Sequence, residues 1–223
     1  MKHIDWQAVA TQTRELFPEV VQIASYSRNR WILVFNEEAE SFLNTFHPLT
    51  RIIHRHKLPI PLIVSVGFIR SSLDSYPLEF LDIQNDYTSL YAVEDVVSGL
   101  RFDANDVRLE IERELRSKWL LTRLAALDYS HKPQRLYGIL EESFTALLPV
   151  FKGFCHLAGR AVPGDMESLL TQLEEILRTE LRAFRFIAGQ KSAPSQTLTA
   201  NLFNDYLRAL NLCIDTIDGW ELS

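Results

Sequence analysis

The chain has 223 residues, and its 23 lysines and arginines against 29 aspartates and glutamates give a formal net charge of −6. This acidic balance disfavours a general nucleic-acid binder, and the apolar share of 47% excludes a mainly disordered chain. The longest apolar stretch, Pro59 to Ile69, is much shorter than the ~20 residues that a membrane-spanning helix needs. Two cysteines do not make a disulfide scaffold in a chain of this length, so we expect a soluble, cytoplasmic protein with no membrane partner.

The first part of the chain changes its hydrophobic pattern at short intervals. Apolar residues at helical spacing predict a helix that begins at Trp6 and ends before Pro18. Two β-branched and aromatic runs, at 20–25 and 30–35, flank a polar stretch and predict a β-hairpin. A second helix is expected from about residue 37 to 57, with a kink at its internal proline.

Three further segments of this half are predicted as strands. Residues 62–69 form a continuous apolar run between prolines and polar residues, which indicates a central strand buried on both faces. Residues 78–83 read as a strand that carries two carboxylates, and 89–93 as a short edge strand. Residues 1–100 are therefore expected to form a mixed β-sheet with two helices.

Residues 101–223 show only helical patterns. The first helix of this half carries an apolar stripe that we expect to be buried: Val107, Ile111, Leu115, Trp119, Leu120, Leu124 and Leu127. Further helices are predicted at about 133–157, after Asp165 to about 187, and at about 197–217. Four long helices with short connections predict an antiparallel four-helix bundle, so the fold class is α+β.

Two carboxylates in the predicted strand at 78–83 are candidates for a ligand or metal site. Side chains alternate along a strand, so Glu79 and Asp82 would point to opposite faces. One of them could face a cleft and bind a metal ion or a sugar hydroxyl. Alternatively, Asp82 makes a structural hydrogen bond that caps the turn at 84–86.

Basic side chains are the other candidates for ligand binding, because the sequence has no glycine-rich phosphate loop. Arg28 and Arg30 lie in the predicted hairpin, and Arg108, Arg116 and Lys118 lie near the start of the first bundle helix. They could hold an anionic ligand, or they could be solvated ion pairs such as that of Arg116 with Glu112 four residues earlier. The candidate ligand-binding set is Arg28, Arg30, Glu79, Asp82, Arg108, Glu112, Arg116 and Lys118. Histidine and cysteine spacing predicts neither a metal site nor a catalytic group.

The segment at 71–83, Ser-Ser-Leu-Asp-Ser-Tyr-Pro-Leu-Glu-Phe-Leu-Asp-Ile, resembles a motif of a bacterial group of nucleotidyltransferase-like proteins of uncharacterised function. The arginine- and glutamate-rich stretch at 107–118 and the stretch at 202–207 are also similar to that group. The resemblance implies a small nucleotidyltransferase-type sheet domain, at 1–100, followed by a four-helix bundle, at 101–223, like the substrate-binding domain of kanamycin-type nucleotidyltransferases.

Active members of that superfamily carry a Gly-Ser pair and an Asp-x-Asp pattern on the first two strands, which hold metal ions for phosphoryl chemistry. The corresponding stretch here, 23–34, has neither. The resemblance therefore implies a catalytically degenerate protein, without a cofactor, that binds a small molecule or nucleotide in the cleft between the domains, or a protein partner. Two alternatives remain: an active enzyme that holds Mg²⁺ with Glu79, Asp82 or Asp86, or a structural protein that forms a homo-oligomer through its bundle.

Overall fold

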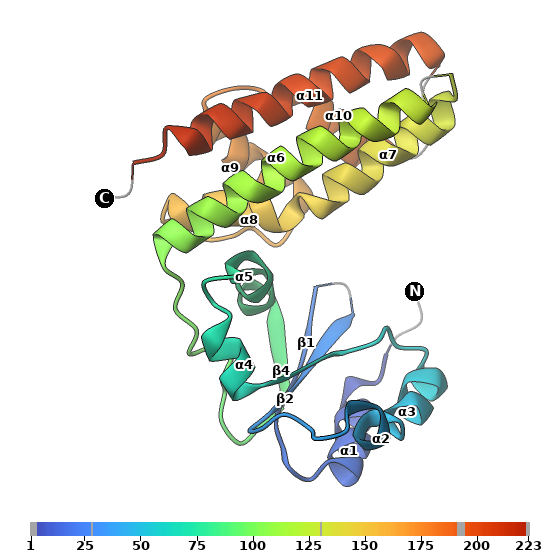
Figure 1. The fold of residues 1–223 in the computed structure, drawn as a ribbon, viewed down its shortest axis with the longest axis vertical. Coiled ribbons are helices and arrows are strands. Elements are labelled where there is room, and N and C mark those ends of the chain that lie inside the picture. The colour runs from blue at the N-terminus through green and yellow to red at the C-terminus, as the bar shows by residue number, and fades with distance from the viewer. Residues whose placement is uncertain (1–3, 28, 130, 191–194, 222–223) are drawn as a thin grey trace. The chain divides into compact units, whose positions relative to one another are not determined.

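A computed structural model describes residues 4–27, 29–129, 131–190 and 195–221 of the chain (Figure 1). The chain forms two compact units, Met1–Phe102 and Asp103–Ser223. The first unit contains a mixed four-stranded sheet with helices, and the second contains only helices in its described residues. The fold class is therefore α+β.

The sheet of the first unit has the order β3-β2-β1-β4. Its strands are β1 (Val20–Tyr26), β2 (Arg30–Phe35), β3 (Leu62–Ser65) and β4 (Tyr87–Ala92). Strands β1 and β2 form the predicted hairpin, in which Tyr26 is paired with Arg30. Strand β4 runs antiparallel to β1, and β3 runs parallel to β2.

Alternate side chains of β2 point into two separate cores, which is why this strand is apolar along most of its length. Trp31 and Leu33 belong to one core, together with residues of the first three helices. Ile32 and Val34 belong to the other core, together with residues of the next two helices. These helices are α1 (Trp6–Leu16), α2 (Phe42–Phe46), α3 (Leu49–His56), α4 (Val66–Ser71) and α5 (Pro77–Asn85). The sheet is thus covered on both faces.

The prediction of a central strand over 62–69 was wrong. Strand β3 ends at Ser65, where the Ser65 hydroxyl accepts a hydrogen bond from the backbone N–H of Phe68 and begins helix α4. In the described sheet, β3 is an edge strand, and Leu62 is 37% exposed. A short apolar run of this kind has the same composition in a strand as in a buried helix, and the serine cap decides between them.

The predicted strand at 78–83 is a helix, α5. Pro77 occupies its first turn, where a proline has no amide hydrogen bond to lose. Phe80, Leu81, Asp82 and Ile83 are all buried, which a strand with one solvated face would not allow. The expected helix at 37–57 begins only at Phe42, and at Pro48, where a kink was predicted, it is divided into α2 and α3.

The second unit contains six helices in its described residues, where the sequence predicted four. They are α6 (Ala104–Tyr129), α7 (Pro133–Ala146), α8 (Leu148–Leu157), α9 (Met166–Leu177), α10 (Arg182–Gly189) and α11 (Gln196–Asp218). The expected second helix is interrupted at Leu147, two residues before Pro149. The expected third helix is interrupted after Leu177, because Arg178 adopts a left-handed conformation with φ of 55°.

The core of the helical unit combines aromatic rings with a short buried chain of hydroxyl groups. The rings of Phe144, Phe151, Phe184 and Tyr206 pack with centroid distances of 5.3 to 5.8 Å. The Tyr206 hydroxyl donates to Ser143 Oγ at 2.8 Å, and that atom lies 2.9 Å from Thr122 Oγ1. These buried hydroxyl groups therefore satisfy one another.

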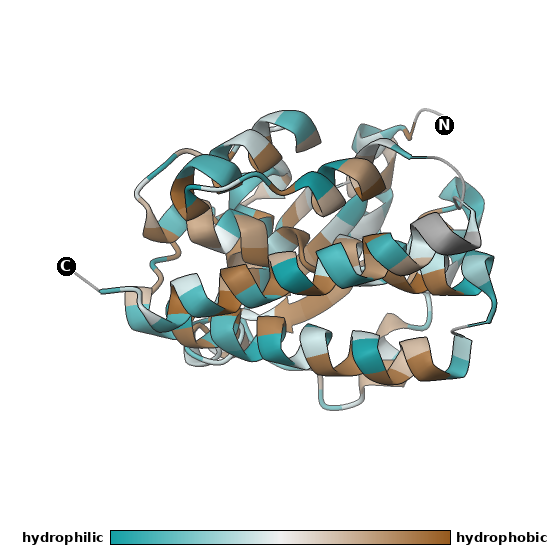
Figure 2. Cartoon of the chain, turned by 90° about the horizontal axis from the view of Figure 1, so that it is seen from above, coloured by the Kyte–Doolittle hydropathy of each residue, from teal (hydrophilic) through white to brown (hydrophobic). Residues whose placement is uncertain are grey.

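The helices alternate hydrophobic and hydrophilic residues along their lengths in both units (Figure 2). None of the helices in the described part of the chain has the length and the apolar character needed to span a bilayer.

Candidate functional site

Two of the candidate residues, Arg30 and Asp82, form an ion pair in the sheet unit. Arg30 begins β2, and its Nη2 donates to Asp82 Oδ2 of α5 at 2.6 Å. The Asp82 side chain is only 7% exposed, whereas that of Arg30 is 53% exposed. The Ser27 hydroxyl also donates to Asp82, at 3.5 Å. The pair therefore joins the β1–β2 hairpin to α5.

The Arg30 guanidinium also lies over the ring of Tyr26, 4.8 Å from its centroid, because the hairpin register places these residues opposite each other. Burial raises the pKa of the Tyr26 hydroxyl, although the positive charge of Arg30 opposes this shift. Tyr26 thus remains a neutral phenol beside the ion pair. The predicted turn cap by Asp82 is replaced by a contact between distant segments of the chain.

The three carboxylates considered for Mg²⁺ do not form a ligand set. Glu79 and Asp86 are exposed, and Asp82 is buried against Arg30. Within the described residues, no three histidine, cysteine, aspartate or glutamate side chains are grouped closely enough to hold a metal ion. Arg28, the remaining candidate of the hairpin, lies outside the described residues.

The candidates on α6 form a chain of ion pairs. Glu112 accepts from Arg108 at 3.3 Å and from Arg116 at 3.0 Å. Arg116 also donates to both oxygens of Asp218 in α11, at 2.9 and 2.7 Å. Lys118 is paired with a glutamate one turn earlier, at 3.9 Å. The charged groups of these four candidates are engaged with one another or with carboxylates, which supports the interpretation as solvated ion pairs.

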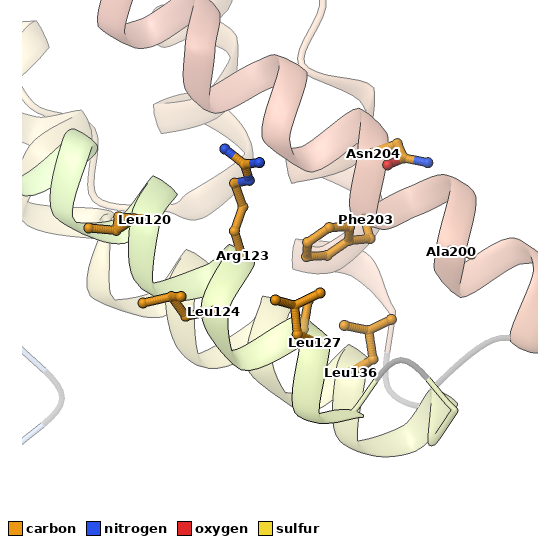
Figure 3. Close-up of a pocket in the computed structure, with 9 residues that line it drawn as sticks. Leu120, Arg123, Leu124, Leu127, Leu136, Ala200, Phe203 and Asn204 are labelled. Atoms are coloured by element: carbon orange, nitrogen blue, oxygen red, sulfur yellow. The ribbon is translucent and has the colours of Figure 1, made fainter.

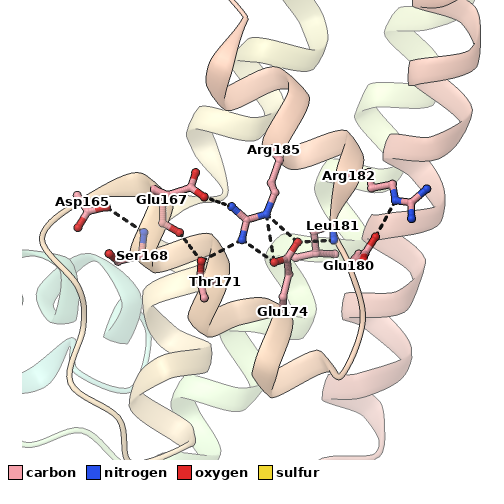
Figure 4. A network of polar contacts seen from close by, with 9 residues as sticks. All are labelled: Asp165, Glu167, Ser168, Thr171, Glu174, Glu180, Leu181, Arg182 and Arg185. Atoms are coloured by element: carbon pink, nitrogen blue, oxygen red, sulfur yellow. Dashed lines mark hydrogen bonds and ion pairs between the residues drawn. The ribbon is translucent and has the colours of Figure 1, made fainter.

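A second charged cluster joins α9 to α10 (Figure 4). Arg185 makes an ion pair with Glu174 at 2.6 Å, contacts Glu167 and donates to the Thr171 hydroxyl at 2.9 Å. The hydrogen bond from Arg185 lowers the pKa of the Glu174 carboxyl, and Glu174 also accepts from the backbone N–H of Leu181. Since its polar groups satisfy one another, we interpret this cluster as structural: it stabilises the contact between α9 and α10.

An open groove of the helical unit is lined by apolar side chains from three helices (Figure 3). Its volume is about 520 Å³, within the range of small-molecule sites. The apolar wall is formed by Leu120, Leu124 and Leu127 of α6, Leu136 of α7, and Ala200 and Phe203 of α11. The three α6 leucines are 53%, 55% and 77% exposed, respectively. Grouped exposure of large apolar side chains is a feature of binding surfaces.

Two polar residues border the groove, Arg123 on α6 and Asn204 on α11 (Figure 3). The Arg123 guanidinium lies over the indole ring of Trp119, 4.2 Å from its centroid. Such stacking holds an arginine in place while leaving its N–H groups free to donate in the ring plane. The groove therefore combines an apolar wall with one positioned cation.

The sequence interpretation placed the groove leucines in the buried stripe, and this was wrong. Val107, Ile111 and Leu115 are fully buried, but the core side of α6 continues through Thr122 and Ala126. Leu124 follows Leu115 by nine residues, or about 2.5 turns, so these two leucines point to opposite sides of the helix. The leucines of the second half of α6 do not lie on the face that is apolar in its first half. This change of face is the sequence signal that could have revealed the groove.

Comparison of the chain with family models, with curated proteins and with solved structures gives no match. The contacts described above are therefore the basis for a functional proposal.

Proposed function

We propose that this chain is a nucleotidyltransferase-like protein that binds a ligand or a partner without transferring a nucleotide. The observation that carries the proposal is the ion pair of the buried Asp82 with Arg30. Nucleotidyl transfer by two metal ions needs clustered carboxylates that are free to coordinate them. A carboxylate that is buried and neutralised by a guanidinium is a poor ligand for Mg²⁺.

The stretch at 23–34 supports the same proposal. In active members of the superfamily this stretch carries the Gly-Ser pair and the Asp-x-Asp pattern, whereas here most of its described residues lie in the paired strands β1 and β2. Ile23, Ile32, Leu33 and Val34 are fully buried and hold the sheet to its helices. The residues at these positions thus contribute to packing.

The finer architecture is part of the proposal. The helical unit would correspond to an antiparallel four-helix bundle whose second and third helices are interrupted, one as α7 and α8 and the other as α9 and α10. The single residue Leu147 between α7 and α8, and the short connection between α9 and α10, support this correspondence. We also propose a cytoplasmic location, since Cys155 and Cys213 are free thiols.

The proposal is tested by incubating the protein with ATP, GTP, CTP or UTP and Mg²⁺ and measuring pyrophosphate release. We expect no release above a blank without protein. Release that is abolished by Asp82→Asn and kept by Asp74→Asn, which changes an exposed carboxylate nearby, would overturn the proposal. The same outcome would favour the alternative of an active metal-dependent enzyme.

The alternative of assembly through the helical unit is favoured by one observation, the exposed leucines of α6. Light scattering at increasing protein concentration tests it. A dimer that dissociates when Leu124 is replaced by glutamine would establish the homo-oligomer, and a monomer at all concentrations would reject it.

A further inference from the structure

Arg123 differs from the other arginines of α6. Arg108, Arg113 and Arg116 are each paired with a glutamate of the same helix. Among the described residues, Arg123 has no ion pair, and it stacks on Trp119 beside the groove. A cation fixed at the edge of an apolar wall can bind the anionic group of a ligand whose remaining part is apolar.

Further unpaired positive charge lies at the same end of the unit. Lys132 and Arg135 flank the start of α7, next to the groove residue Leu136, and both are exposed. Neither makes an ion pair with a described residue. The exposed Asp128 of α6 offsets part of this charge, but together with Arg123 the positive groups are in excess here and favour an anion.

The groove is long enough along α6 to hold an alkyl chain. Leu120 and Leu127 are separated by about 10 Å along α6 at 1.5 Å per residue, which is about the length of an extended octyl chain. Arg123 lies between them on the helix, while Leu127, Leu136 and Ala200 line the groove beyond Arg123. An anionic group at Arg123 would therefore leave its apolar chain over these side chains.

We propose that the groove between α6 and α11 binds an elongated apolar molecule that carries one anionic group, a carboxylate or a phosphate monoester. Arg123 donates hydrogen bonds to the anionic group. Leu124, Leu127 and Phe203 cover the apolar chain. The proposal concerns the helical unit alone, and it does not depend on whether the sheet unit transfers nucleotides.

A second copy of this chain fits the groove less well. A two-fold contact places the same surface of both copies together. The unpaired Arg123, Lys132 and Arg135 of both copies would then lie in one interface, where like charges repel. The anionic group of an apolar ligand would instead neutralise part of the positive charge beside the groove.

The proposal is tested by calorimetric titration with decanoate, dodecanoate, dodecyl phosphate and dodecylammonium, each kept below the concentration at which it forms micelles. We expect the anions to bind and the ammonium compound not to bind. Each methylene that enters the groove should tighten binding up to about fourfold, so dodecanoate should bind more tightly than decanoate. Comparison of dodecanoate with dodecyl phosphate identifies the preferred head group.

Paired variants assign the binding to the groove. Arg123→Gln should weaken dodecanoate binding about tenfold. Arg14→Gln is the matched control, because Arg14 stacks on Tyr91 of the sheet unit, 3.9 Å from its centroid, and should have no effect. Leu124→Gln should weaken binding about fivefold, whereas Leu109→Gln, at an exposed leucine of α6 outside the groove, should not. All four residues are exposed, and circular dichroism checks that the variants fold.

Three results would overturn the proposal. The first is the absence of binding by all alkyl anions. The second is equal binding of dodecylammonium and dodecanoate, since this would indicate a surface without charge preference. The third is binding that is unchanged by both Arg123→Gln and Leu124→Gln, since this would place the site elsewhere.

Discussion

The ion pair of Arg30 with Asp82 makes a quantitative prediction about the stability of the sheet unit. Asp82 is almost completely buried, while Arg30 is half exposed. Arg30→Met removes the exposed partner and withdraws a positive charge from a buried carboxylate. Asp82→Asn removes the buried charge and leaves a guanidinium that water can still solvate. We therefore expect Arg30→Met to be the more costly change.

The exposed fractions of the Arg30 and Asp82 side chains determine how much each substitution should lower the free energy of unfolding. Arg30→Met should lower the free energy of unfolding by about 2 kcal/mol, below the range for a fully buried pair because Arg30 reaches solvent. Asp82→Asn should cost about 1 kcal/mol, the contribution of one hydrogen bond. The coupling energy from the double-mutant cycle should be about 1 to 2 kcal/mol, since it lies between the values of exposed and buried pairs.

Urea unfolding combined with amide hydrogen exchange measures these changes in the sheet unit separately from the helical unit. The matched control is the pair of Arg70 with Glu94 in the same unit, at 3.8 Å, with side chains 69% and 64% exposed. Its coupling should be below about 0.5 kcal/mol. A coupling of Arg30 with Asp82 no larger than that of the control would refute the reasoning, because Asp82 would then be available to other ligands.

Three other predictions concern the helical unit. Leu115→Ala should lower the free energy of unfolding by about 3 kcal/mol, because Leu115 is fully buried. Leu124→Ala should lower it by less than about 0.5 kcal/mol, because Leu124 lies in the exposed wall of the groove. Equal losses in urea unfolding would contradict the assignment of these two leucines to opposite sides of α6. Arg185 lowers the pKa of the Glu174 carboxyl from its ordinary 4.5. The stability that this ion pair gives the folded protein is therefore present above pH 4.5, and it is lost as the pH falls through the lower pKa that Glu174 has in the folded state. Arg185→Gln should therefore flatten the fall in stability as the pH drops below 4.5, and an unchanged pH profile would contradict this stabilising role of the cluster. Burial raises the pKa of the Cys155 thiol to about 11 and also raises that of the second cysteine, so neither should react with a disulfide reagent at pH 8 until urea unfolds the protein.

The hairpin and the long helices could be predicted because each repeats one pattern over several residues. β1 and β2 are rich in β-branched and aromatic residues. The change of hydrophobic period near residue 100 falls next to the boundary between the two units. α11 extends only one residue beyond each predicted end.

Short segments could not be assigned because local features decide them. Phe80 and Ile83 are compatible with a strand or a helix, and Pro77 at the first helical position favours the helix. Leu147 and Arg178 interrupt helices whose apolar pattern continues on both sides of the break. Backbone conformation, such as the left-handed Arg178, has no periodic signal in the sequence.

The candidate residues, too, could be predicted only in part. Arg30 and Asp82 were both proposed from the sequence, but their contact joins segments 52 residues apart and depends on α5 being a helix. The groove was missed because a single buried stripe was assumed for α6, whereas its apolar residues lie on two sides. Arg123 could not be selected from the sequence, because it differs from the other arginines of α6 only in lacking the ion pairs that the structure gives them.

Binding of Mn²⁺ in the presence of ATP, measured by electron paramagnetic resonance, tests most directly whether Asp82 is available to a metal ion. If Arg30 occupies Asp82 as described, wild type, Asp82→Asn and the exposed-site control Asp74→Asn should bind the same amount of Mn²⁺. One tightly bound Mn²⁺ per chain that is lost in Asp82→Asn and kept in Asp74→Asn would contradict the account.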